Sequence, residues 1–195
     1  MSTRCPNCQR SLPTASAKCL HCGTLENDTV QPTEIQSTEI DQVVLEIDLH
    51  IDQALHAVEQ DDFQAALRSL NRAMVDAPDD RLAECYSLRG YVYLKLEDFK
   101  RAEADCSEAI FKYWSEAHTF AWRAAAHGEQ DNWPSAFNDL ANACDNARSK
   151  RDQYLQLMES YIESASEYYR QQIVDGNDSA DLFYDRGWVY FQAGR

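Results

Sequence analysis

The sequence predicts a mainly α protein, an α-α superhelix of stacked helical hairpins preceded by a small cysteine-rich segment. An alanine-centred signature recurs along the chain, and its alanines, Ala66, Ala102 and Ala136, lie 36 and 34 residues apart. A helix-sized apolar pattern stands on each side of the signatures, and a repeat of this length is typical of a helical-hairpin array. The other observation is a pair of Cys-x-x-Cys motifs within the first 25 residues. Because such arrays bind other chains along a curved surface, a scaffold is a better first hypothesis than an enzyme.

Length and composition agree with this fold class. The chain has 195 residues, 44% of them hydrophobic, with six glycines and five prolines. These values suit one helical array with a small appendage. No apolar run approaches the roughly 20 residues that a membrane span needs, and the polar start is unlike a signal peptide. We therefore expect a soluble, cytoplasmic protein without a membrane span.

Charge is distributed unevenly along the chain. Residues 1–25 hold three basic residues and no acidic one, whereas eleven acidic residues and no lysine or arginine occur from Glu26 to Asp62. Nucleic-acid binding normally needs a basic face, and a net charge of −15 repels a phosphate backbone. The charge therefore argues against nucleic acid as a partner, except at the N-terminal segment. The acidity either provides solubility or steers a basic partner.

The cysteine-rich segment predicts a zinc site. Two Cys-x-x-Cys pairs are separated by ten residues, and each tight turn supplies two thiolates for one tetrahedral zinc ion. The candidate ligands are Cys5, Cys8, Cys19 and Cys22. Four cysteines leave no coordination position for a catalytic water, so the Zn²⁺ is expected to be structural and to supply the folding energy of this short segment. The pattern resembles the short zinc-ribbon family, although Gln9 stands where that family commonly has glycine.

Other interpretations of these cysteines have less support. A thiol–disulfide site needs only one Cys-x-x-Cys motif, usually in a thioredoxin-like domain, and nothing in the sequence suggests that domain. A disulfide framework requires export, for which the sequence has no signal. His21 could replace a cysteine as a ligand, but between two cysteines it is more typical of a turn.

Residues 26–42 are polar and acidic, which predicts a flexible linker. From residue 43 the apolar residues recur at helical spacing. Three helical hairpins are predicted over about 47–80, 83–116 and 117–146. The phase then slips, and residues 147–174 could form one long helix or a short irregular hairpin; we expect an irregular helical pair over 147–178. A half unit is predicted over 180–195, and the predicted array covers residues 43–195.

The apolar pattern of the hairpins resembles the tetratricopeptide repeat family. In the second hairpin the match is nearly complete, with Tyr86, Gly90, Tyr93, Phe99, Ala102 and Ala109 at the family's positions and Trp114 in place of the closing proline. The first hairpin has Ala54 and Ala57 where glycine and tyrosine are usual, and the third has His127 in the tyrosine position. The half unit matches at Phe183, Gly187 and Tyr190. Its aromatic face predicts that the array continues or that another molecule covers it, including another copy of this chain.

The resemblance implies a concave groove lined by the first helix of each hairpin. The candidate groove residues are Ile51, Leu55, Ser87, Tyr91, Leu94, Lys95, Ala121 and Ala125. A mostly apolar groove with tyrosines suits an amphipathic helix or an extended peptide, although any one of these residues can simply pack between helices. One branch of the family grips chaperone tails with lysine, asparagine and arginine. The corresponding positions are Ile51, Leu55, Leu88, His118 and Trp122, so that clamp is absent.

The leading hypothesis is a non-enzymatic adaptor that binds a protein partner through this groove. The alternative is a nucleic-acid-linked or transcription-associated regulator that contacts its target through the zinc ribbon. A redox or zinc-release sensor and the non-catalytic front part of a larger protein also remain open. No catalytic constellation stands out: His50 and His56 fall on different helical faces, and the glycines form no phosphate-binding loop.

Overall fold

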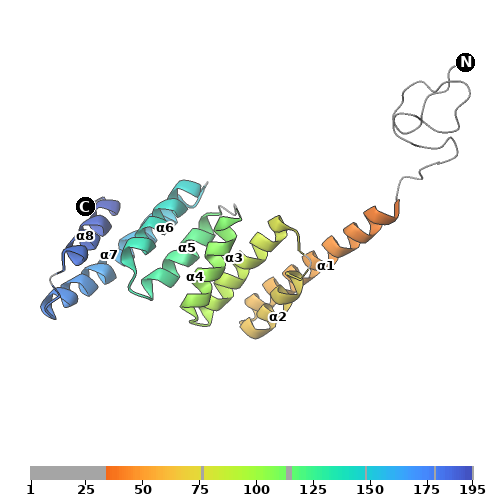
Figure 1. The fold of residues 1–195 in the computed structure, drawn as a ribbon, viewed down its shortest axis with the longest axis horizontal. Helices are drawn as coiled ribbons and strands as arrows, with labels where there is room; N and C mark the ends of the chain where they lie inside the picture. Colours follow the sequence, from red (N-terminus) through yellow and green to blue (C-terminus); the bar gives the residue numbers. More distant parts are fainter. Residues whose placement is uncertain (1–33, 76, 113–115, 148, 178, 195) are drawn as a thin grey trace, which may run out of the picture. The chain divides into compact units, whose positions relative to one another are not determined.

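The computed structural model describes residues 34–75, 77–112, 116–147, 149–177 and 179–194. Within these ranges it holds eight α-helices and no strand, which confirms the all-helical prediction there (Figure 1). The helices are α1 (Glu34–Glu59), α2 (Phe63–Ala73), α3 (Asp79–Lys95), α4 (Phe99–Phe111), α5 (Ala117–Gly128), α6 (Trp133–Asn146), α7 (Arg151–Val174) and α8 (Ala180–Gln192). The chain divides into two compact units, 1–43 and 44–195, and the packing described below lies in the second.

In the hairpins α1/α2, α3/α4 and α5/α6, the turn between the two helices has the same geometry. Asp61, Glu97 and Asp131 have positive φ angles of 57°, 59° and 57°, and the residue after each donates its backbone N–H over 2.9 Å to the carbonyl five positions earlier. Asp62 and Asp98 then cap the second helix, because their carboxylates accept the backbone N–H three residues ahead. A residue in the left-handed backbone conformation, followed by a capping aspartate, fixes where the second helix begins.

Small residues let the two helices of each hairpin approach closely. The signature alanines Ala66, Ala102 and Ala136 are fully buried, with 0% exposure. A Cβ atom built on Gly90 would lie 2.6 Å from Cys106 Sγ and 3.3 Å from the carbonyl oxygen of Ala102. Helix α3 can therefore pack on α4 at this distance only because residue 90 has no side chain.

Two partly buried ion pairs, which the sequence pattern did not predict, join the helices of the second and third hairpins. The Arg89 guanidinium donates to both carboxylate oxygens of Asp105 at 2.6 and 2.9 Å. Arg123 donates in the same way to Asp139, at 2.7 Å to each oxygen. Both pairs span 16 residues, so they occupy equivalent places in the two hairpins. Bidentate arginine–carboxylate pairs fix geometry as well as charge, and here they set the register of one helix on the other.

The structure differs from the sequence prediction at two places. Where an irregular helical pair was expected over 147–178, α7 is a single helix, because its buried residues recur every three or four positions without a glycine or proline between them. These residues are Tyr154, Met158, Ile162, Ala165 and Tyr169. Helix α1 already begins at Glu34, so residues 34–42 are helical where a flexible linker was predicted. The predicted zinc ribbon over 1–25 lies outside the described residues.

The apolar interior forms clusters along the chain. One joins α1, α2 and α3 around Ile51, Leu70 and Val92, and another joins α5 to α8 around Phe137 and Leu140. A hydrogen bond of 2.6 Å between the buried Ser87 and Thr119 hydroxyls links α3 to α5. None of the described helices combines the length and apolar character needed to cross a membrane.

Candidate functional site

The eight predicted groove residues lie on α1, α3 and α5, but three of them do not reach the surface. Ile51, Ser87 and Ala121 are buried, with exposures of 4%, 1% and 7%. They pack between helices and do not line a groove. The sequence spacing identified the correct helices, but it did not distinguish the residues that pack against a neighbouring helix from those that face solvent. Of the other five residues, Leu55 and Lys95 are exposed and Tyr91, Leu94 and Ala125 are half-buried.

An apolar cavity of about 160 Å³ lies among α1, α2, α3 and α5. It is lined only by apolar and aromatic residues: Ala54, Leu55, Val58, Leu70, Leu88, Tyr91, Val92 and Trp122. Leu55 and Tyr91 were predicted as groove residues. Leu88 and Trp122 were noted in the sequence only because they stand where the chaperone-binding branch of the family has polar residues. An apolar cavity of about 150 Å³ can hold a benzene molecule. The space therefore suits one aromatic ring or one branched aliphatic side chain.

The Tyr91 and Trp122 rings, tilted against each other, form one edge of this cavity. The Tyr91 and Trp122 ring centroids lie 4.8 Å apart, and the His118 ring lies 4.5 Å from Trp122 on α5. Burial lowers the pKa of His118, so this imidazole packs as a neutral ring at pH 7. The Lys95 ammonium lies 5.4 Å from the Tyr91 ring centroid and places one positive charge beside the apolar site.

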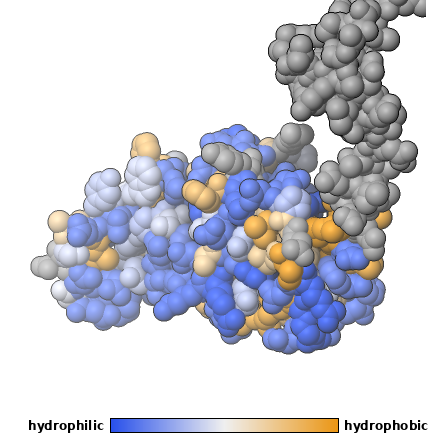
Figure 2. Space-filling model, turned by 45° about the vertical axis from the view of Figure 1, so that its right-hand side comes forward, coloured by the Kyte–Doolittle hydropathy of each residue, from blue (hydrophilic) through white to orange (hydrophobic). Residues whose placement is uncertain are grey.

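Exposed apolar side chains surround the same part of the protein. Figure 2 shows hydrophobic residues gathered toward α1 and α2, whereas much of the visible surface elsewhere is hydrophilic. On α1, Leu45, Leu49 and Leu55 are 68%, 54% and 43% exposed. Exposed apolar groups that gather on one surface are typical of protein interaction sites.

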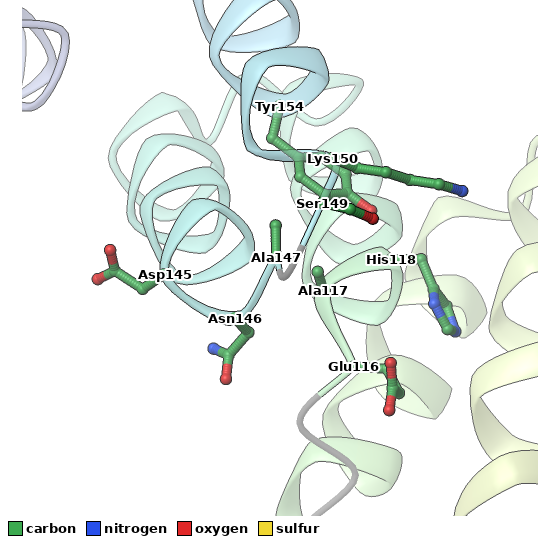
Figure 3. A pocket seen from close by; sticks show the side chains of 9 residues that line it. All are labelled: Glu116, Ala117, His118, Asp145, Asn146, Ala147, Ser149, Lys150 and Tyr154. Carbon is green, nitrogen blue, oxygen red and sulfur yellow. The ribbon is translucent and has the colours of Figure 1, made fainter.

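A larger hollow of about 490 Å³ lies where α5 begins, α6 ends and α7 begins (Figure 3). Its lining is mostly polar: Glu116, Ala117, His118, Asp145, Asn146, Ala147, Ser149, Lys150 and Tyr154. In Figure 3 the side chains of Asp145 and Asn146 lie on one side, and those of Glu116, His118 and Lys150 on the other. Because these groups do not converge on one point, the hollow lacks the arrangement of a catalytic site.

The described residues hold no group of three or more histidine, cysteine or acidic side chains placed to bind a metal ion. The four predicted zinc ligands lie outside those residues. Cys85, Cys106 and Cys144 are buried. Burial raises the pKa of Cys85 to about 11 and that of Cys106 to about 12, so these thiols stay protonated and behave as small apolar side chains.

No protein-family model matches the sequence. Among solved structures, the crystal structure of MamA protein covers 76% of this chain and 83% of its own length, with a TM-score of 0.51 and 18% sequence identity. The fold is of the tetratricopeptide repeat type. A tetratricopeptide repeat protein from Parabacteroides merdae covers 77% of this chain and 74% of its own length, with a TM-score of 0.33 and 16% identity.

Proposed function

We propose that the protein is a non-enzymatic, cytoplasmic scaffold that binds a peptide or helix of a partner protein at the apolar cavity. The observation that carries the proposal is a space of about 160 Å³ with an entirely apolar and aromatic lining. It is bordered by an exposed Leu55 and by the rings of Tyr91 and Trp122, which pack against each other. Peptide-binding surfaces typically take one or a few apolar anchors into such pockets. The tetratricopeptide-type fold supports the same class of function, because helical-repeat arrays present extended binding surfaces.

Burial of one anchor side chain would provide most of the affinity at this site. Complete burial of a leucine- or phenylalanine-sized side chain contributes about 1.5–3 kcal/mol. Lys95, above the Tyr91 ring, favours an acidic residue next to the anchor. The remaining surface belongs to a chain of net charge −15 and disfavours strongly acidic partners. Charge therefore contributes to the choice of partner and apolar burial to the affinity.

A peptide-display library selected against the full chain tests this proposal. Selected peptides should share one aromatic or branched aliphatic residue, and Trp122→Ala should weaken their binding at least about tenfold, which corresponds to ~1.4 kcal/mol. Leu88→Glu, which places a carboxylate in the cavity wall, should abolish binding. Phe111→Ala serves as the matched control, because Phe111 is an aromatic residue with 80% exposure outside the cavity.

Loss of binding in the Trp122 and Leu88 variants, but not in the Phe111 variant, would support the cavity as the site. Circular dichroism and thermal melting must first establish that each variant keeps the helical fold. Selected peptides that bind all three variants equally would contradict the proposal, as would a library that yields no specific binder.

We also propose that Cys5, Cys8, Cys19 and Cys22 bind one structural zinc ion. Two Cys-x-x-Cys turns supply a complete tetrahedral set of thiolates. The alternative function rests on the same segment, because residues 1–25 carry three basic residues and no acidic one. Salt-dependent binding of the zinc-loaded segment to DNA or RNA would favour this nucleic-acid-linked alternative, whereas no binding would exclude it.

A further inference from the structure

The apolar cavity has an acidic border on α1. Leu55 lines the cavity, and Asp52 and Glu59 stand three residues before it and four residues after it on the same helix. Side chains at these spacings lie on one side of a helix, so the two carboxylates flank Leu55. Both acidic residues are exposed. A segment that binds in the cavity therefore meets negative charge where it passes over α1.

The basic residues described near α1 offset little of this charge. Helix α1 contains seven acidic residues and no lysine or arginine. Arg81 of α3 lies 2.8 Å from Asp48 of α1, but it also lies 2.8 Å from Glu84, so one guanidinium is shared between two carboxylates. Glu59 lies 3.7 Å from the exposed His56, and a contact between two exposed side chains is weak. The α1 border therefore keeps a net negative charge.

The opposite border, on α3, carries a positive charge. The Lys95 ammonium lies 5.4 Å from the ring centroid of Tyr91, which lines the cavity and packs against Trp122. Lys95 is exposed, and the ion pairs found among the described residues do not include it. Its charge is therefore available to a partner, and the cavity lies between two borders of opposite sign.

The polar hollow at the start of α5 does not change this order of charges. The His118 ring lies on the same side of the hollow as Glu116 and Lys150, whose charges are opposite (Figure 3). On the other side of the hollow, Asp145 lies 3.9 Å from Arg151. The hollow therefore has no excess of either sign, and the charge difference arises at the cavity itself.

We propose that the cavity binds a segment of a partner protein whose charges lie on opposite sides of its apolar anchor, with a basic residue over Asp52 and Glu59 and an acidic residue beside Lys95. This inference rests on the proposed function, because it concerns the same cavity. Burial of the anchor supplies affinity but no orientation. Borders of opposite sign favour one orientation, since the reverse places like charges together. A second copy of the chain fits less well, because two chains of net charge −15 repel each other.

A peptide library of restricted composition serves as the probe. Each peptide carries phenylalanine at its centre and only lysine, glutamate or serine at the positions on either side. Selection against the full chain should enrich peptides with lysine on one side of phenylalanine and glutamate on the other. In fluorescence anisotropy, a selected peptide should bind at least about threefold tighter than a peptide of the same composition with both charges mixed on each side. This difference should shrink at high salt.

Charge-reversal variants test the contact of each border with the peptide. Asp52→Lys should weaken binding of the selected peptide at least about threefold and should favour peptides with glutamate on both sides. Lys95→Glu should weaken it to a similar extent and should favour peptides with lysine on both sides. The matched controls are Glu159→Lys on α7 and Lys100→Glu on α4, which should bind the peptide as the wild type does, because neither residue lines the cavity. All four positions are exposed, so each variant should keep the wild-type melting temperature.

The outcomes distinguish this inference from the proposed function. Peptides that need phenylalanine and Trp122 but carry lysine and glutamate in no preferred arrangement would overturn the inference and leave the proposed function standing. A library without any phenylalanine-dependent binder would overturn both. Self-association in sedimentation velocity that Asp52→Lys abolishes would also overturn the inference, as would tighter peptide binding by a chain with Arg4→Glu and Arg10→Glu. These two results would assign the acidic border to a second copy and to the chain's own N-terminal segment, respectively.

Discussion

Alanine at Gly90 and alanine at Gly187 should change stability in opposite directions, although the two glycines hold equivalent places in α3 and α8. Alanine is favoured over glycine inside a helix by about 1 kcal/mol. At Gly187 a Cβ meets nothing within 4 Å, so Gly187→Ala should retain most of that gain and stabilise α8 by about 0.5–1 kcal/mol.

At Gly90 the same gain is outweighed by steric overlap. The new Cβ would lie 2.6 Å from Cys106 Sγ and 3.3 Å from both the Ala102 oxygen and the Cys106 nitrogen. The sulfur can turn away, but the two backbone atoms move only if α4 shifts. Overpacking of a buried site costs about 1–3 kcal/mol, and the upper part of that range, about 2–3 kcal/mol, applies because two of the three close atoms are backbone. Gly90→Ala should therefore lower the free energy of unfolding by about 1–2 kcal/mol after the helix gain is subtracted.

Urea denaturation of the two single variants measures these effects, with hydrogen exchange to follow α8, because helical-repeat proteins can open locally at their ends. Cys106→Ala should partly rescue Gly90→Ala by removing the nearest atom, and a double-mutant cycle should give a favourable coupling of at least about 0.5 kcal/mol. If Gly90→Ala were neutral or stabilising, α3 and α4 would not approach as closely as described, and the reasoning on the small residues would fail.

Three further predictions concern charge and metal. Asp139→Ala should lower the free energy of unfolding by about 2–4 kcal/mol, because it leaves Arg123 half-buried without its carboxylate; chemical denaturation checks this. Burial lowers the pKa of His127, so the unfolded chain takes up a proton first and stability should fall as pH drops below about 6.5. His127→Phe should remove part of that dependence in melts from pH 5 to 8, because the buried His118 contributes in the same direction. Elemental analysis should find one zinc per chain, lost on combining Cys5→Ser with Cys19→Ser.

Each of these predictions has a control on the surface of the protein. Asp79 is also ion-paired but its side chain is 88% exposed, so Asp79→Ala should change stability by less than about 0.5 kcal/mol. His56, whose side chain is 75% exposed, is the matched histidine substitution in the same melts. Removal of zinc should leave the helical circular dichroism signal unchanged. Loss of this signal would contradict the prediction that the repeat array folds independently of the N-terminal segment.

The repeat could be predicted from the sequence because its signals are local. A capping aspartate, an aromatic residue and an alanine such as Ala102 recur in order, and each acts through its own helix or turn. The single helix α7 was harder to predict. The spacing of tetratricopeptide repeats favoured two helices with a turn between them, whereas the apolar residues of α7 recur at helical spacing without interruption. The Arg89–Asp105 and Arg123–Asp139 pairs were missed because a 16-residue spacing has meaning only once two helices pack antiparallel.

The candidate site was predicted only in part, for a related reason. Helical spacing places Ser87 and Tyr91 on the same side of α3. In the structure Ser87 lies beneath that side, bonded to Thr119, and Tyr91 borders the cavity. Which of these two positions is buried depends on how α5 packs against α3, and the sequence of α3 alone does not contain this information.

The apolar cavity arises where residues of this chain depart from regular repeat packing. Trp122 packs against Tyr91 while the small Ala54 faces the same space, so large side chains border a cavity that they do not fill. Regular positions hold the hairpins together by mutual burial and have no free surface left for a partner. Substitutions at Trp122 should therefore affect binding more than folding, whereas substitutions at Gly90 should do the opposite.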